Sequence, residues 1–285
     1  AEFPKVDYDG GGGLTATYGT GVSSGSTVSP TSAASASTGV RLMKAYPSVS
    51  KVDLTSSERV LVTGSAVPLY KIKVTANNGD ISIAKFTFTV SSSSVSATTS
   101  KFSLFAFTDA GFSSADGNFN GTANPGGLLN AGNCYDGQAS NSAAALGSAG
   151  LQALVEIYPD ATGCNTATTS LKIPSGESRW LRLEASIASL APSGTAESLS
   201  VQMEGDSAFP VAHQGGSAVS GDMGTFGLLA EQGVIDATNN DFVWSPRSTS
   251  TNETDARYLN NLDWTNGYGV SGLSSTNMAA ETLSK

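Results

Sequence analysis

The stretch DGNFNG, which begins at Asp116, has the residue types and spacing of the first half of a calcium-binding loop. Asp116, Asn118 and Asn120 alternate, so their side-chain oxygens could converge on one cation, and Asp109 supplies a further carboxylate. The bidentate Glu that completes such a loop is missing, because Gly127 stands in its place. The pattern indicates either a site for calcium, the only cofactor that the sequence suggests, or an ordinary turn.

Residue combinations typical of catalysis are sparse. His213, the only histidine, stands among small residues without a nucleophile motif nearby, so a Ser-His-Asp system is not indicated. Glu204 and Asp206 are close in sequence and are candidates for a paired-carboxylate glycosidase, which depends on their separation in space. No glycine-rich phosphate loop follows a predicted strand. We therefore expect a protein that is not an enzyme.

Cys134 and Cys164 are the only two cysteines. A metal site would need more ligands, so the pair indicates a disulfide bond, with two separate buried thiols as the alternative. A bridge that closes this loop would stabilise the fold by roughly 3–4 kcal/mol on the chain-entropy model. It would also indicate an oxidising, extracellular setting.

The three tryptophans are candidates for stacking on sugar rings or for packing in the core. DFVWSP predicts a strand with Phe242 and Trp244 on one face, and WTNGYGV places Trp264 before an Asn-Gly turn. We favour a closing pair of strands with these two tryptophans in the core. Trp180 lies in a predicted strand, from which it could contact a sugar if its face is exposed.

Alternation of apolar and polar residues, the pattern of half-buried β-strands, recurs from Val40 onward. The inward positions that it predicts are Tyr70, Ile72, Val74, Ala84, Phe86, Phe88, Val90, Leu181, Leu183, Ala185, Ile187, Leu199, Val201 and Met203. Asn-Gly within residues 77–80 predicts a hairpin between the first two of these strands. Residues 102–107 are apolar on both faces, so we expect them to form a central strand.

Residues 1–39 differ from the remainder in being rich in Gly and Ser. Such a segment buries too little apolar surface to offset its ordering entropy. Leu14, Ala16 and Tyr18 nevertheless alternate with threonines, as in a short strand. The segment is therefore either a solvated linker or an arm that adds a strand to an open sheet edge of a neighbouring subunit.

Composition narrows the classes of partner. Charged residues make up 14 % of the 285 residues, against about 25 % in an ordinary soluble domain. The net charge of −9 disfavours binding to nucleic acid or to anionic membranes. No run of about 18 apolar residues is present, so we expect no membrane span. The first residues lack a basic-then-apolar signal, which suggests a mature product or an excised fragment.

Short strands separated by turn clusters predict an all-β fold. We expect an antiparallel β-sandwich of Ig-like or jelly-roll-like type, with an extended Gly/Ser-rich N-terminal arm and long loops. The arm would comprise residues 1–39 and the sandwich residues 40–285. Residues from about 109 to 168 would form an insertion that the disulfide staples onto the sandwich.

Three motifs carry a family resemblance: GVRLMKAYPS at Gly39–Ser48, KFTFTV at Lys85–Val90, and the ending DFVWSPxST…DWTNGYGVxGL…ETLSK. In these motifs the chain resembles large secreted surface proteins of ultra-small, candidate-phylum bacteria, over roughly residues 38–285. The resemblance implies secretion and a role at the cell surface or in an appendage. It supplies no catalytic residues, and the arm lies outside it.

These observations together predict a self-assembling structural subunit of an extracellular filament or surface layer. Its partners would be copies of itself, joined non-covalently when the arm of one copy adds a strand to the next. The alternative is an adhesin-like module that binds cell-surface glycans. Either function would place the protein outside the cell, at its surface or in an appendage.

Overall fold

The computed structural model describes residues 7–8, 19–20, 27–28, 35–36, 43–93, 97–122, 124–130, 152–159, 170–207, 241–247, 264–273 and 277–285. The chain divides into two compact units, Ala1–Met43 and Lys44–Lys285, close to the boundary predicted at residues 39/40. The described residues form β-strands and two short 3₁₀ helices. None of the described segments is a helix long and apolar enough to cross a membrane.

The described residues of the first unit form two nested pairs of very short strands. β1 (Asp7–Tyr8) pairs with β4 (Ser35–Ala36), and β2 (Gly19–Thr20) pairs with β3 (Thr27–Val28), both antiparallel. Two-stranded ribbons without further strands are marginally stable in water. The pairing that the described residues of this unit form is therefore weak by itself.

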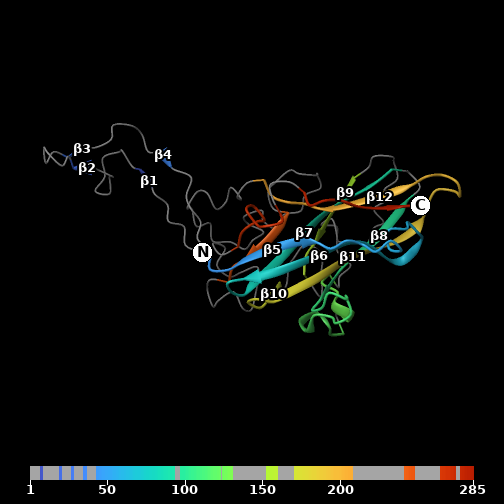
Figure 1. Cartoon of the computed structure of the whole chain (residues 1–285), viewed down its shortest axis with the longest axis horizontal. Helices are drawn as coiled ribbons and strands as arrows, with labels where there is room; N and C mark the ends of the chain where they lie inside the picture. The colour runs from blue at the N-terminus through green and yellow to red at the C-terminus, as the bar shows by residue number, and fades with distance from the viewer. Residues whose placement is uncertain are drawn as a thin grey trace. The chain divides into compact units, whose positions relative to one another are not determined.

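The second unit, the body, contains two antiparallel sheets, and the predicted all-β sandwich is confirmed (Figure 1). The first sheet has four strands in the order β5 (Tyr46–Lys51), β6 (Gly64–Asn77), β11 (Ser178–Ser189) and β8 (Thr98–Phe107). Figure 1 shows β5, β6 and β11 side by side. The finer Ig-like or jelly-roll-like assignment stays a prediction.

The second sheet has six strands and is organised around β7. Its members are β7 (Ile81–Ser92), β9 (Gln152–Ile157), β10 (Leu171–Ile173), β12 (Ser198–Met203), β13 (Phe242–Ser245) and β14 (Glu281–Ser284). β7 pairs with β9, β10, β12 and β13, and β14 pairs with β12. Because β7 is long, two short strands can follow one another along each of its edges.

The core between the sheets consists of the alternating apolar residues that the sequence predicts. All the predicted inward residues are buried. The Tyr70 ring of β6 meets the Phe88 ring of β7 edge-on, with 6.1 Å between centroids, and this contact joins the two sheets.

The hairpin predicted at residues 77–80 is wrong. β6 and β7 follow one another directly, yet they belong to different sheets. Asn78 has φ +62°, as an Asn-Gly turn allows, but the turn passes the chain from one layer to the other. Turn chemistry predicts that the chain reverses; it does not determine which strand becomes the hydrogen-bonding partner.

The central position predicted for residues 102–107 is also wrong, because β8 pairs with β11 alone among the strands. Residues 114–122 and 124–130, which include η1 (Gly117–Phe119) and η2 (Pro125–Gly127), cover its outer edge. Leu129 donates a backbone hydrogen bond to Leu104, and Asn130 binds the backbone of Leu104 and Phe102 with its side-chain amide. The apolar character of β8 thus reflects a covered edge.

Burial of β7 on both faces was not expected. The inward set faces β6, but Lys85, Thr87 and Thr89, predicted to point away from the core, are also buried. Val243 and Trp244 of β13 and Glu156 of β9 are buried beside them. The outer face of this sheet therefore carries a second, smaller buried region, which contains charged groups.

Candidate functional site

The buried charges on the outer face of β7 surround Lys85. The Lys85 Nζ lies 2.5 Å from Oε1 of Glu156, and both side chains are 0 % exposed. Glu204 continues β12 beside Thr87, to which its N–H donates, and Asp241 immediately precedes β13. Ion pairs removed from water cost desolvation energy, so their presence requires a structural or chemical explanation.

Asp241 is a carboxyl group whose protonation is governed by its burial. Burial raises the pKa of Asp241 to about 8, with further increases from Asp206, Glu204 and Glu156, while Lys85 opposes the rise. A carboxyl group with this pKa is mostly neutral at pH 7. The Lys85 cluster (Lys85, Glu156, Glu204, Asp206 and Asp241) therefore combines a buried lysine with four buried carboxyl groups, of which Asp241 is mostly neutral at pH 7.

Asp206 connects this cluster to the C-terminal motifs. Its Oδ1 accepts the backbone N–H of Asp241 at 2.9 Å, and its Oδ2 accepts those of Phe242 and Gly267 at 3.2 and 2.7 Å. Burial raises its pKa, although these three N–H groups oppose the rise. A side chain at Gly267 would place Cβ 2.9 Å from Oδ2, so only glycine fits without a shift. Asp206 thus joins two distant segments.

Trp244 joins the same segments through its backbone and its indole. Trp244 and Thr265 exchange backbone hydrogen bonds of 2.9 and 2.8 Å, and the indole N–H donates to the Asn266 carbonyl at 2.7 Å. Trp244 and Trp264 are both buried, which supports the core interpretation and leaves neither ring free for a sugar. A bulge places Trp244 opposite Ile83, so it does not share a face with Phe242, contrary to the prediction.

Residues 264–273, which we call the connecting segment, contact β13 at Thr265 and β5 of the other sheet at Ser271. Val49 of β5 donates its N–H to the Ser271 carbonyl at 2.8 Å. Gly272 has φ +90°, and a Cβ there would lie 1.6 Å from the Val49 carbonyl oxygen. The glycine-rich ending therefore lets the backbone close one edge of the sandwich.

The last residues are held to the body by charge and by backbone pairing. Glu281 is buried and binds Lys51 at 2.7 Å and Arg59 at 2.5 Å. Burial raises the pKa of Glu281, but hydrogen bonds and charge from these two cations outweigh it, so the pKa is lowered. Ser284 exchanges backbone hydrogen bonds with Arg59 and Leu61, which covers the outer edge of β14.

The residues proposed for calcium have other roles in the structure. Asp116 is buried, pairs with Arg179 and accepts the N–H of Asn118 at the start of η1. Asp109 accepts N–H groups of residues 111, 113 and 114, chiefly Ser114, and these hydrogen bonds lower its pKa despite some desolvation. Asn120 follows η1 as its C-cap. Within the described residues no group of three or more His, Cys, Asp or Glu is arranged around a metal position, so the geometry lends calcium no support.

The glycosidase candidates lie within the Lys85 cluster. Glu204 and Asp206 are buried, and Asp206 is committed to three backbone N–H groups. A carboxylate pair that cleaves a sugar must face a cleft, and neither residue offers such exposure. Trp180, on β11, is half-buried and lies 5.4 Å from the Lys73 ammonium, which covers its ring.

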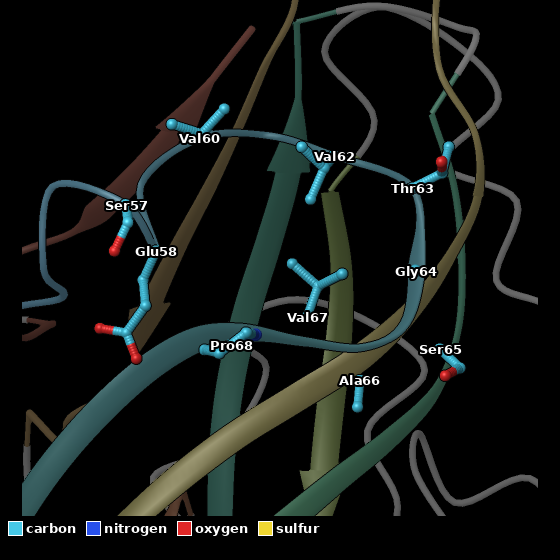
Figure 2. Close-up of a pocket in the computed structure, with 10 residues that line it drawn as sticks. All are labelled: Ser57, Glu58, Val60, Val62, Thr63, Gly64, Ser65, Ala66, Val67 and Pro68. Atoms are coloured by element: carbon cyan, nitrogen blue, oxygen red, sulfur yellow. The ribbon is translucent and has the colours of Figure 1, made fainter.

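An open hollow of about 410 Å³ lies in the connection between β5 and β6 (Figure 2). Figure 2 shows Val62 and Val67 directed toward each other across the loop, with Glu58 at its side. Val60 and Val62 are exposed, whereas Glu58 is engaged by Lys71 at 2.6 Å. The lining offers no group suited to catalysis.

Several sequence predictions lie outside the described residues. They are the disulfide between Cys134 and Cys164, the arm positions Leu14, Ala16 and Tyr18, and the loop around His213. Sequence reasoning also missed Lys85, Glu156 and Asp241. A signal was present, because Lys85 is the only charged residue in the strand ISIAKFTFTV, but alternation suggested that it faces solvent.

Comparisons with known proteins give no family. No protein-family model matches the chain, and no curated protein matches it. Among solved structures, one similar chain is described as "AvmM Catalyzes Macrocyclization in Alchivemycin A Biosynthesis". The alignment has 12 % identity and a TM-score of 0.24, and covers 55 % of this chain and 72 % of the other. A likeness of this size carries no argument about function.

Proposed function

We propose that the protein is a self-assembling extracellular structural subunit of a filament or surface layer. In this proposal the N-terminal unit of one copy adds a strand to a sheet edge of the next. The observation that carries it is the division into a sandwich body and a separate unit with only short strand pairs described. Opening such pairs costs little, so the same residues are available to pair elsewhere.

The covered edges of the body narrow the choice of acceptor. Residues 114–122 and 124–130 cover β8, Ser271 covers β5, and residues 59–61 cover β14. Within the described residues, β9 and β10 each pair with β7 alone, and β9 is the longer of the two, which makes its outer edge the proposed acceptor. Residues 154–157 of β9 are all buried and, apart from Glu156, apolar, so a strand added there would extend an existing core.

Leu14, Ala16 and Tyr18 are the proposed donor residues, because alternate side chains of an added strand enter pockets along the acceptor. Head-to-tail addition that does not close on itself produces a filament. A stable junction of this kind buries upward of about 1,000 Å². The low content of charged residues, 14 %, reduces the desolvation needed for close packing between copies.

Deletion of residues 1–43 tests the proposal. We expect the truncated body to melt cooperatively and to remain monomeric at concentrations where the full chain forms polymers, measured by light scattering and negative-stain microscopy. A peptide of residues 1–39 added to the truncated body should slow hydrogen exchange in β9 more than in β8. Polymers of the truncated body, or no polymers of the full chain, would contradict the proposal.

The glycan-binding alternative depends on Trp180, because Trp244 and Trp264 are buried. Fluorescence titration with cell-surface glycans tests it, with Trp180→Phe as the matched variant. A saturable change in the wild type that the variant loses would favour this alternative over assembly.

A further inference from the structure

The Lys85 cluster has a geometry that suits a covalent bond between side chains. Residues directly opposite each other on paired strands share a face, and so do residues two apart on one strand. Thr87 lies opposite Glu156 on β9, and Lys85 lies opposite Val243 on β13. Asp241 precedes Val243 by two residues, so Lys85, Glu156 and Asp241 share the buried outer face of the sheet.

The long Lys85 side chain can reach carboxyl groups on both neighbouring strands. Diagonal neighbours across a strand pair lie about 7–8 Å apart, within reach of long side chains. The amine already lies 2.5 Å from Glu156 on one side. On the other side, its charge acts on both Asp241 and Asp206. Asp206 is held by three N–H groups, which leaves Asp241 as the better reaction partner.

We propose that Lys85 and Asp241 become joined by an amide bond between their side chains once the body has folded, with Glu156 carrying protons. Glu156 first removes a proton from the Lys85 ammonium. The Nζ lone pair then attacks Cγ of the neutral Asp241 carboxyl group, and Nζ–Cγ forms. The Cγ–OH bond breaks as Glu156 returns its proton to the departing hydroxyl, which leaves as water. Glu156 then takes the second proton from nitrogen and ends neutral.

The buried setting favours each step of this condensation. Burial raises the pKa of Asp241, which keeps its carboxyl group in the neutral form that an amine can attack. Well-oriented groups react with effective molarities of about 10⁵–10⁸ M, and exclusion of water opposes hydrolysis of the product. Asp206 is a positioning residue, because it holds the N–H of Asp241. The bond would tie β7 to the start of β13, whether or not the protein assembles.

Intact-mass spectrometry of the denatured, fully reduced full chain tests the proposal. We expect a mass lower than that of the sequence by one water molecule. Tryptic digestion should give a branched peptide that contains uncleaved Lys85 linked to Asp241. The full sequence mass, or a bond from Lys85 to Glu156 or Glu204 in place of Asp241, would overturn the proposal without the need for any variant.

Variants separate the roles of the three residues. We expect no loss of water in any of three variants, because none of them forms the amide bond. Each should have the full mass of its own sequence: Lys85→Met, Asp241→Ala and Glu156→Gln. Lys71→Met is the matched control, because Lys71 is a buried lysine paired with Glu58 at 2.6 Å, and it should keep the deficit. Persistence of the deficit in Lys85→Met would also overturn the proposal.

Discussion

Buried carboxylates in this protein hold separate segments together by accepting hydrogen bonds. Asp206 accepts backbone N–H groups from two segments, whereas Glu281 binds two cationic side chains. Both oxygens of Asp206 accept hydrogen bonds, and the two cations compensate the charge of Glu281, which offsets the cost of burial. Two glycines allow close approach because they lack a side chain: Gly267 lies against the Asp206 carboxyl group, and Gly272 lies against the Val49 carbonyl.

Gly272→Ala should destabilise the body by about 3 kcal/mol or more, because the new methyl group would overlap the Val49 carbonyl. Gly269→Ala is the matched control in the same segment. Its φ is also positive, +78°, but nothing lies within 4 Å, so only the left-handed backbone cost of about 1–2 kcal/mol applies. Urea denaturation measures both; equal losses would show that the connecting segment does not press on β5.

Glu281→Gln should cost about 2 kcal/mol at neutral pH, because hydrogen bonds to charged partners are lost. The folded pKa of Glu281 lies below its ordinary value, so its contribution is present above about pH 4.3 and disappears as pH falls through the folded pKa. The difference between wild type and variant should therefore shrink in acid.

Thermal melts of wild type and Glu281→Gln at about four pH values between roughly pH 3 and pH 7 would measure how the stability difference changes with pH. Lys172→Met serves as the control, because it breaks the exposed pair with Asp80 at 3.6 Å. That change should cost less than about 1 kcal/mol. A pH-independent difference for Glu281→Gln would show that lost packing, and not charge, explains the effect.

At the scale of the individual element, neighbouring loops cover the strands that lie at the edges of the two sheets. β8 shows this most clearly, because Asn130 satisfies a backbone N–H and a carbonyl that would otherwise be open to another strand. The edge of β5 is met by the connecting segment, and that of β14 by residues 59–61. Edge protection of this kind limits unwanted pairing and leaves fewer positions for a specific partner.

Asn130→Ala should destabilise the body by about 2 kcal/mol or more, since it leaves two buried backbone groups of β8 without their partner. Asn124→Ala removes one hydrogen bond, to the Leu128 carbonyl, and should cost about 1 kcal/mol. Equilibrium unfolding gives both values. Earlier elution from a size-exclusion column for Asn130→Ala alone would be a further sign of an opened edge that pairs with another copy; equal losses of stability would contradict this role.

At the scale of the whole molecule, the proposed assembly and the proposed disulfide both depend on segments outside the described residues. The body provides the sheets and the covered edges, and the N-terminal unit provides the candidate donor. The two proposals are independent, because a disulfide would act within the body while the donor acts between copies.

Reduction of the bridge between Cys134 and Cys164 should lower the free energy of unfolding by roughly 3–4 kcal/mol. Differential scanning calorimetry with and without reductant measures this, and Cys134→Ser with Cys164→Ser should match the reduced wild type. An unchanged melting temperature on reduction would favour two separate thiols.

Much of the fold was predictable from local patterns. Period-2 alternation identified the inward residues of β6, β11 and β12, because one face of each strand packs against the opposite sheet. The same rule failed for Lys85 and Thr87, since it assumes that the second face meets water. Lys85, Glu156 and Asp241 were therefore missed, although Glu204 and Asp206 of the same cluster were identified by their closeness in the sequence.

The sequence alone determined the all-β class, the separate N-terminal segment and the core role of the C-terminal tryptophans, because these depend on composition and on residues near one another in the chain. Only the tertiary structure decided which strands pair, which edges are covered, and that Lys85, Glu156 and Asp241 share one buried face. Those features depend on contacts between residues far apart in sequence, which no local pattern encodes.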